Sequence, residues 1–190
     1  MSVTVREIET QPALWRQSAG AAAEAASKLP AAGERIAVVG CGTSYYIAQA
    51  VAVLRESLGL GESDAFAASE MPTQRPYDCV VAISRSGTTT EVARALAAVP
   101  DTTRTLAISA VADTPVVEQA DDAVLLEFAD ETSIVQTRFA TAALALMRGH
   151  FGQSLDEAVS QAQAAVSDPL PADPADFEHF VFLGHGWSVG

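Results

Sequence analysis

Lysine is almost missing from this sequence, and basic residues as a class are few. One lysine, Lys28, and ten scattered arginines face 24 acidic residues, which gives a formal net charge of −13. Binding of duplex nucleic acid requires a clustered basic surface, so this balance argues against nucleic acid as a partner. A small anion bound by such a chain must be held locally, by backbone dipoles and hydroxyl groups.

Long hydrophobic runs and a cysteine framework are lacking as well. No apolar stretch reaches the roughly 20 residues that cross a bilayer, and the first residues do not form the basic start and apolar centre of a signal peptide. The two cysteines, Cys41 and Cys79, lie at or beside expected strands and are typical of reduced, buried residues. We therefore expect a cytoplasmic globular protein that does not engage a membrane.

Short apolar runs alternate with helical segments along the 190 residues, which are enough for one good core. The predicted strands are 36–39, 64–70, 79–83, 105–109 and 123–126. Runs that are apolar throughout indicate strands covered on both faces, as in a parallel sheet between two helical layers. We expect a three-layer αβα, flavodoxin-like domain with a five-stranded parallel sheet of order 2-1-3-4-5, preceded by an N-terminal helix.

Capping residues and prolines place the expected helices. The first is predicted from Thr10, which can cap it, to about Lys28, with Pro12 in its first turn. A long helix is predicted to open at Asp130 and to run to about Arg148, with residues 135, 139, 142, 143 and 146 on one apolar face. The other helices are expected at 45–58, 89–98, around 116 and at 154–166, followed by a Pro-rich connector at 167–174.

The stretch Cys79-Val-Val-Ala-Ile-Ser-Arg-Ser-Gly-Thr-Thr-Thr-Glu91 predicts a buried strand, a tight turn and the start of a helix. A helix N-terminus offers unpaired N–H groups and a partial positive charge, and the turn adds hydroxyl groups and a permissive Gly87. Two interpretations stay open from this stretch alone. The turn holds a phosphate, or Thr88 caps the helix with Glu91 as its partner in a capping box.

A second turn rich in glycine and hydroxyl groups, Gly40-Cys-Gly-Thr-Ser44, follows the first predicted strand. In a sheet of order 2-1-3-4-5 the two turns meet where the strand order reverses, which is where doubly wound sheets bind ligands. Their pairing favours phosphate binding. A dinucleotide site is a weaker alternative, because the third glycine of its fingerprint is missing and only Glu70 could meet the ribose.

The C-terminal stretch Phe180-Val-Phe-Leu-Gly-His-Gly-Trp-Ser repeats the pattern of Ile36-Ala-Val-Val-Gly-Cys-Gly-Thr-Ser, about 144 positions earlier. Chance is the alternative, since this pattern is short. A lone first strand cannot fold by itself, so we expect the chain to be the front of a longer protein. The expected division is an N-terminal helical segment (1–30), a domain (31–152), a helix and Pro-rich linker (153–177), and the first strand and turn of a second, incomplete repeat (178–190).

These motifs make the sequence resemble the sugar isomerase (SIS) domain family. The two turns look like the family's signature turns, and the resemblance continues through Ala68-Ser-Glu70 and Glu131-Thr-Ser-Ile-Val-Gln-Thr-Arg138, so that it covers about residues 35–150. It points in particular to the isomerase half of glucosamine-6-phosphate synthase and to AgaS-like phosphosugar deaminase/isomerases. The resemblance implies a tandem, homodimeric domain that binds a phosphosugar without a metal or an organic cofactor.

Carried over position by position, the resemblance implies a phosphosugar site with hydroxyls on the phosphate and further residues on the sugar. The implied residues are Gly42, Thr43, Ser44, Ser84, Arg85, Ser86, Gly87, Thr88, Thr89, Ile134 and Gln136. Arg85 stands where the synthases often have Gln, and we expect it either to pair with phosphate or to point to solvent. Gln136 stands where the synthases have Ser, which leaves the sugar unspecified.

The catalytic base is not identified by the sequence. Aldose–ketose isomerisation needs a base to move a proton between C1 and C2, and the resemblance implies that the family's catalytic Glu, Lys and His lie in the second repeat and C-terminus. Glu131 is the candidate carboxylate here, weighed against a capping role at a helix start. The expected function is phosphosugar binding, as the first SIS domain of a hexosamine or ketohexose 6-phosphate isomerase or deaminase. The alternative is a non-catalytic sugar-phosphate-sensing regulatory domain.

Overall fold

The computed structural model describes residues 2–185, and its centre is a five-stranded sheet in which all neighbouring strands are parallel. The strands, in the order β2-β1-β3-β4-β5, are β1 (Ile36–Gly40), β2 (Ser63–Ala67), β3 (Cys79–Ile83), β4 (Arg104–Ser109) and β5 (Asp122–Leu125). This confirms the predicted fold and strand order. The order reverses between β1 and β3.

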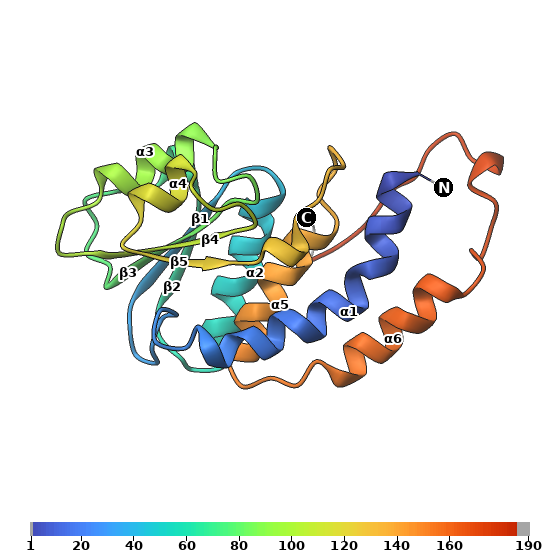
Figure 1. Ribbon diagram of the computed structural model, residues 1–190, viewed down its shortest axis with the longest axis horizontal. Helices are drawn as coiled ribbons and strands as arrows, with labels where there is room; N and C mark the ends of the chain where they lie inside the picture. The colour runs from blue at the N-terminus through green and yellow to red at the C-terminus, as the bar shows by residue number, and fades with distance from the viewer. Residues whose placement is uncertain (1, 186–190) are drawn as a thin grey trace.

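Helices cover both faces of the sheet (Figure 1). They are α1 (Val3–Glu24), α2 (Thr43–Ser57) and α5 (Arg138–His150) on one side, and α3 (Thr90–Ala98) and α4 (Pro115–Gln119) on the other. Along the central strands, Val38 and Val81 pack toward α2 and α5, whereas Val39 and Val80 pack toward α3 and α4. Both faces are fully buried, which explains the uninterrupted apolar runs of the sequence.

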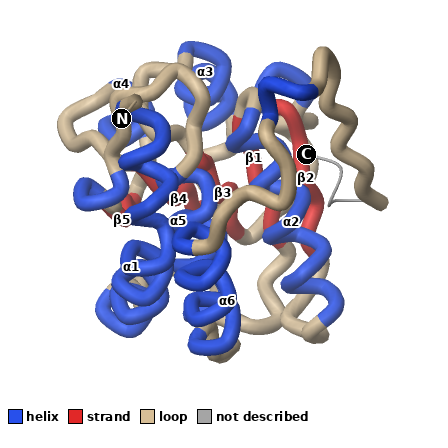
Figure 2. Tube along the Cα trace, turned by 90° about the vertical axis from the view of Figure 1, so that its right-hand side faces the viewer, coloured by secondary structure: helices blue, strands red, loops and turns tan. Residues whose placement is uncertain are grey.

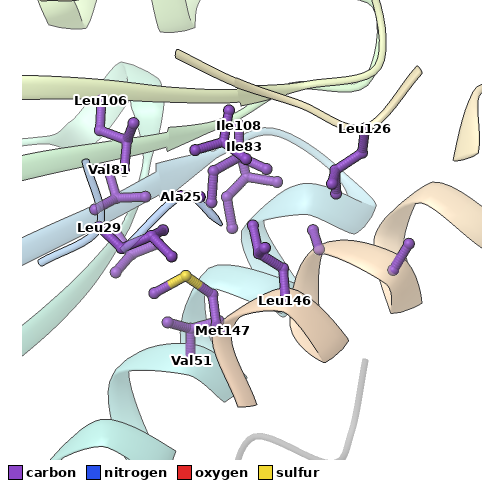
Figure 3. Close-up of a cluster of buried hydrophobic side chains, with 14 of the residues drawn as sticks. Ala25, Leu29, Val51, Val81, Ile83, Leu106, Ile108, Leu126, Leu146 and Met147 are labelled. Atoms are coloured by element: carbon purple, nitrogen blue, oxygen red, sulfur yellow. The ribbon is translucent and has the colours of Figure 1, made fainter. Parts of the chain in front are cut away.

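The core between the sheet and α5 is made of large aliphatic side chains (Figure 3). Leu146 and Met147 of α5 belong to the same cluster as Val81, Ile83 and Leu106 of the sheet, and all five are fully buried. Burying one such side chain contributes about 1.5–3 kcal/mol. The position of α5 relative to the strand ends is therefore well determined by packing.

Helix α1 begins earlier than predicted. Its N-cap is Ser2, whose hydroxyl accepts from the Val5 N–H, so the expected start at Thr10 is wrong. Thr10 instead donates its hydroxyl to the Glu7 carbonyl, and Pro12 lies buried in the helix interior. Packing along α5, visible in Figure 2, offsets the backbone hydrogen bond that a proline removes.

The long helix predicted from Asp130 begins only at Arg138, so this boundary is also wrong. A short 3-10 helix (Glu127–Ala129) follows β5, and residues 130–137 form a connection without helix or strand that projects from the body in Figure 1. Val135, expected on the apolar face of the helix, is exposed. The other four expected face positions, 139, 142, 143 and 146, are buried in the core.

The C-terminal part consists of α6 (Asp156–Ser167), which packs beside α1, and a 3-10 turn (Pro174–Asp176). In the described part of this region, residues 180–183 form no strand and are exposed, as is reasonable for a strand sequence without a neighbour to pair with. The rest of the predicted second turn, 186–190, lies outside the described residues. No helix among residues 2–185 is long and apolar enough to span a membrane.

Candidate functional site

The turn between β3 and α3 is organised by its own hydroxyl groups. Ser84 Oγ lies 3.2 Å from Thr89 Oγ1, and Ser86 Oγ lies 2.9 Å from Thr88 Oγ1. The Thr88 N–H donates to Ser86 Oγ over 3.3 Å, and the Gly87 N–H donates to the Ser84 carbonyl over the same distance. Four hydroxyl groups thus gather on a turn of six residues directly behind a buried strand.

Gly87 fits this turn for two separate reasons. Its φ is +62°, a conformation that side chains other than glycine rarely adopt. A Cβ at this position would lie 1.9 Å from Thr114 Oγ1 and 2.7 Å from Thr114 Cβ. The Gly87 carbonyl also accepts from the Val116 N–H over 2.9 Å, so the turn packs directly on the start of α4.

The start of α3 carries no side-chain cap. Its N-cap residue, Thr89, makes no capping hydrogen bond, and the Ala93 N–H to the Thr89 carbonyl is the first backbone bond of the helix. The capping box between Thr88 and Glu91, the alternative to a phosphate site, is not formed, because the Thr88 hydroxyl faces Ser86 instead. The first N–H groups of a nine-residue helix are therefore directed toward the hydroxyl-rich turn, an arrangement that suits an anion.

The turn between β1 and α2 is similarly tight. A Cβ on Gly40 would lie 2.6 Å from the backbone of Ser44, so the strand end and the helix start approach as closely as glycine allows. Gly42 is the N-cap, with φ +55° and no side-chain cap bond. Thr43 is exposed and Ser44 is buried. This helix, too, begins without a side-chain cap and beside a hydroxyl side chain, although the Ser44 and Tyr45 N–H groups donate to the Cys41 and Gly42 carbonyls.

The two turns lie next to each other at the carboxyl end of the sheet. They follow the neighbouring strands β1 and β3, in which Val39 pairs with Ala82. Burial raises the pKa of the Cys41 thiol, a backbone hydrogen bond from Ala68 lowers it, and the Glu91 carboxylate at the start of α3 raises it again. Cys41 is therefore within electrostatic reach of α3, and its thiol stays protonated and adds no charge to the site.

The side chain of Arg85 does not point to solvent but is held by the connection behind β5. Its Nη1 donates to Asp130 Oδ1 over 3.1 Å and to the Glu131 carbonyl. The Arg85 carbonyl in turn accepts from the Ala110 N–H over 3.0 Å. Arg85 thus ties the turn behind β3 to the connection 130–137 behind β5.

Glu131 has the geometry of a helix cap. Only 1% of its surface is exposed. Its Oε2 accepts from the Thr137 N–H (2.6 Å), the Thr137 hydroxyl (3.1 Å) and the Arg138 N–H (3.0 Å), and its Oε1 accepts from the Phe139 N–H (3.1 Å). Both oxygens are used at the start of α5, in the capping role that was weighed against catalysis.

The structure does not bring Ile134 and Gln136 onto the two turns. Ile134 is completely exposed at the tip of the 130–137 connection. Gln136 is partly buried, and its Oε1 has no hydrogen-bond partner among the described residues. Glu7 of α1 binds Thr132 in the same connection, a contact that was not predicted from the sequence. A single glutamate on a polar helical stretch gave no signal of this contact.

Other parts of the described structure show no competing centre. A cavity of about 410 Å³ lies between α1 and the connection from α5 to α6, lined by Arg16, Gly149 and Asp156 among others, and none of the residues of the two turns borders it. Within residues 2–185, no three side chains of His, Cys, Asp or Glu are grouped as a metal site would require. The carboxyl end of the sheet is the best candidate site.

Comparison with known proteins agrees with this architecture. A family model described as the SIS domain matches residues 29–148. The fold is similar to glucosamine-6-phosphate deaminase from Thermotoga maritima, with 22% identity, a TM-score of 0.69 and coverage of 87% of this chain and 54% of that one. It is also similar to tagatose-6-phosphate ketose/aldose isomerase from Escherichia coli, with 20% identity, a TM-score of 0.73 and coverage of 85% and 52%.

A third similar structure is the Vibrio vulnificus NanR protein complexed with ManNAc-6P, with 18% identity, a TM-score of 0.54 and coverage of 80% of this chain and 66% of that one. At such identities the likeness shows a shared fold. The chain spans about half the length of the deaminase and isomerase structures. The comparison with curated proteins gives no match.

Proposed function

Because the chain belongs to the SIS domain family, we propose that it binds a sugar phosphate where β1 and β3 end, with the phosphate on the turn 84–89. The observation that carries the proposal is the uncapped start of α3 beside the hydroxyls of Ser86, Thr88 and Thr89. Backbone N–H groups and hydroxyls bind an anion without basic side chains, which suits a chain of net charge −13. Each hydrogen bond to a charged group contributes about 1.5–3 kcal/mol.

The proposed ligand class is a hexosamine or ketohexose 6-phosphate. Two of the similar structures carry such a sugar phosphate in their enzyme names, and the third holds ManNAc-6P. On this proposal, Thr43 and Ser44 face the sugar, because their turn adjoins the phosphate turn at the switch point. The structure leaves Ile134 and Gln136 away from the two turns, so on this proposal the tip of the connection behind β5 bends toward the sugar for them to contact it.

We propose two possible roles for the bound sugar phosphate. In the first, the chain is the first SIS domain of an isomerase or deaminase, and it acts as a cytoplasmic homodimer without a metal or organic cofactor. The second is a non-catalytic sensor. Glu131, the candidate carboxylate of this chain, accepts four hydrogen bonds at the start of α5, which favours capping over catalysis for this residue. Incubation of a protein that carries the second repeat with each sugar phosphate, followed by NMR, separates the two roles, since only the enzyme produces a new sugar phosphate.

A thermal-shift panel tests the ligand class. Fructose 6-phosphate, glucosamine 6-phosphate, ManNAc-6P and NAD are each added at millimolar concentration. A ligand present at ten times its Kd stabilises the native state by about 1.4 kcal/mol, which raises the Tm of a domain of this size by roughly 3–6 °C. A response to NAD and to none of the sugar phosphates would contradict the proposal.

Two substitutions test the turn itself. Ser86→Ala and Thr89→Val each remove one hydroxyl and should each raise the Kd for the sugar phosphate about tenfold, the equivalent of about 1.4 kcal/mol. The Tm should change little, because these side chains are only partly buried. Thr102→Val, an exposed threonine just before β4 at the opposite end of the sheet, is the matched control. If neither turn variant changes the affinity measured by calorimetry, the turn serves only to start a helix.

A further inference from the structure

Helix α1 buries a carboxylate that the proposed site does not use directly. Glu7 is 4% exposed, whereas the other inward-facing residues of this helix, Pro12, Ser18 and Ala22, are uncharged. Glu7 Oε1 accepts from the Thr132 N–H over 2.7 Å and lies 3.3 Å from the Thr132 hydroxyl, which also donates to it. Burying a charge is costly unless it is hydrogen-bonded, and here the bonds go to a connection 125 positions away in the sequence.

That connection, 130–137, is joined to the proposed phosphate turn by Arg85, which donates to Asp130 Oδ1 and to the Glu131 carbonyl. We infer that Glu7 is a positioning residue, which holds the 130–137 connection in place so that Arg85 stays tied to it and the phosphate turn keeps its geometry. The inference rests on the proposed function. Thr4 strengthens the same contact, since its Oγ1 lies 2.9 Å from Ser133 Oγ.

The anchors of the connection lie on either side of its tip. Arg85 holds the start of the connection through Asp130. Glu131 holds its end by accepting from the Thr137 N–H. Glu7 and Thr4 hold residues 132 and 133 from α1. Residues 134–136 bridge two anchored points without helix or strand of their own. Their placement follows from the anchors, and α1 supplies the nearer one.

The carboxylate is well suited to this task. Burial raises the pKa of Glu7, but the polar groups of Ser133 and Thr132 beside the carboxylate outweigh burial and hold the pKa below its ordinary value of 4.5. Glu7 is therefore ionised at neutral pH, and hydrogen bonds to an ionised acceptor are about twice as strong as neutral ones. A neutral glutamine would fill the same space with a weaker hold on the connection.

Unpaired polar atoms gather around the same connection. Among the described residues, Glu7 Oε2, Arg85 Nε, Gln136 Oε1 and Arg138 Nε are buried without a hydrogen-bond partner. Native proteins keep few such atoms, and each calls for a physical reason. The connection is held by a few strong hydrogen bonds, while several polar atoms around it remain without a hydrogen-bond partner. The loss of one anchor should therefore lower the fraction of molecules in which the connection is in place.

The test compares Glu7→Gln with Glu9→Gln, which makes the same charge change at an exposed position of the same helix. The apparent Kd is the intrinsic Kd divided by the binding-competent fraction. If Glu7→Gln leaves the connection in place one tenth of the time, the Kd for the sugar phosphate that binds the unmodified protein rises tenfold. Calorimetry on the full chain measures the Kd, and amide hydrogen exchange reports on residues 130–137 in the absence of ligand.

The inference predicts a higher Kd and faster exchange at 130–137 in Glu7→Gln, and no change in either for Glu9→Gln. A merely structural role would lower the Tm and leave the Kd of the folded variant unchanged, and this result would overturn the inference. If Glu7→Gln does not fold, Thr4→Val replaces it and should shift both readouts in the same direction; unchanged values would then overturn the inference. If the unmodified protein binds no sugar phosphate, the proposed function fails, and hydrogen exchange alone decides whether Glu7 holds the connection.

Discussion

Replacement of Gly87 by alanine perturbs the phosphate turn by a single methyl group. The backbone at Gly87 has φ +62°, and an added Cβ would lie 1.9 Å from Thr114 Oγ1, well inside van der Waals contact. Thr114 is buried at the N-cap of α4, so it has little room to move away. We expect the turn to shift, and with it the N–H groups and hydroxyls that are proposed to hold the phosphate.

The cost follows from the two constraints. An L-residue in the left-handed conformation costs about 1–2 kcal/mol. Forcing an extra carbon against a packed neighbour costs typically about 1–3 kcal/mol more. Gly87→Ala should therefore lower the free energy of unfolding by about 2–5 kcal/mol. Since a domain has about 5–15 kcal/mol in total, the variant should still fold, with the Kd for a sugar phosphate raised at least tenfold.

Urea denaturation measures this effect. With an m-value of about 2–3 kcal/mol/M, the unfolding midpoint should fall by roughly 0.7–2.5 M. Gly20→Ala is the control, because that glycine lies in α1 with no atom within 4 Å of the added Cβ, and it should stabilise by about 0.5–1 kcal/mol.

A double-mutant cycle separates the clash from the backbone strain. Thr114→Gly removes both of the closest atoms, so the pair Gly87→Ala and Thr114→Gly should be more stable than the sum of the single changes predicts by at least about 1 kcal/mol. Strict additivity, or a loss below about 1 kcal/mol for Gly87→Ala alone, would refute the steric reasoning.

Two further predictions concern carboxylates. Glu131→Gln should destabilise the fold by about 2–4 kcal/mol in urea denaturation, because an amide cannot accept all four hydrogen bonds at the start of α5; lost turnover without lost stability would instead indicate a catalytic role. Folding lowers the pKa of Glu7 below 4.5 and that of Asp121 below 3.8. The two carboxylates therefore stabilise the folded state fully above those pH values, and this stabilisation is lost as the pH falls through their folded-state pKa values. The Tm should hence drop on acidification below about pH 4.5, and less steeply in Glu7→Gln; equal slopes for the two proteins would contradict this.

The sheet was predictable from the sequence because a parallel strand buried on both faces leaves an unmistakable trace. Cys79–Ile83 is β3 with the bounds that the apolar run predicts, and the other strands differ by a few residues at their ends. The strand order followed from the fold class rather than from the residues themselves. Every residue of such a strand is buried, so the strand can be recognised from its own run of apolar residues.

The two wrong helix boundaries have a common cause. Thr10 and Asp130 both belong to residue types that start helices, yet neither does so here. At α5 the capping carboxylate, Glu131, lies six to eight positions before the N–H groups from which it accepts. A rule based on adjacent residues does not detect a cap at this distance. At α1, packing against α5 carries the helix through Pro12, and a proline seen in sequence says nothing of that packing.

The candidate site divides in the same way. The hydroxyls and glycine of the turn 84–89 were recognisable, because each acts within a few residues of its partner. The orientation of Arg85 and the role of Glu7 were not, since both depend on a connection 45 or more positions away. Contacts between distant segments come from the tertiary fold, and no periodicity or spacing in the chain encodes them directly.

The contact between α1 and residues 132 and 133 has a consequence for the order of assembly during synthesis. These partners are 125 and 129 positions apart, and at about 5–20 residues per second they are made roughly 6–25 s after α1. Bringing together the ends of a chain segment of this length costs conformational entropy, which only many simultaneous contacts offset. We expect the two turns to form with the sheet while α1 still waits for its partner. A newly made chain would then have both turns in place before α1 fixes the connection 130–137 beside them.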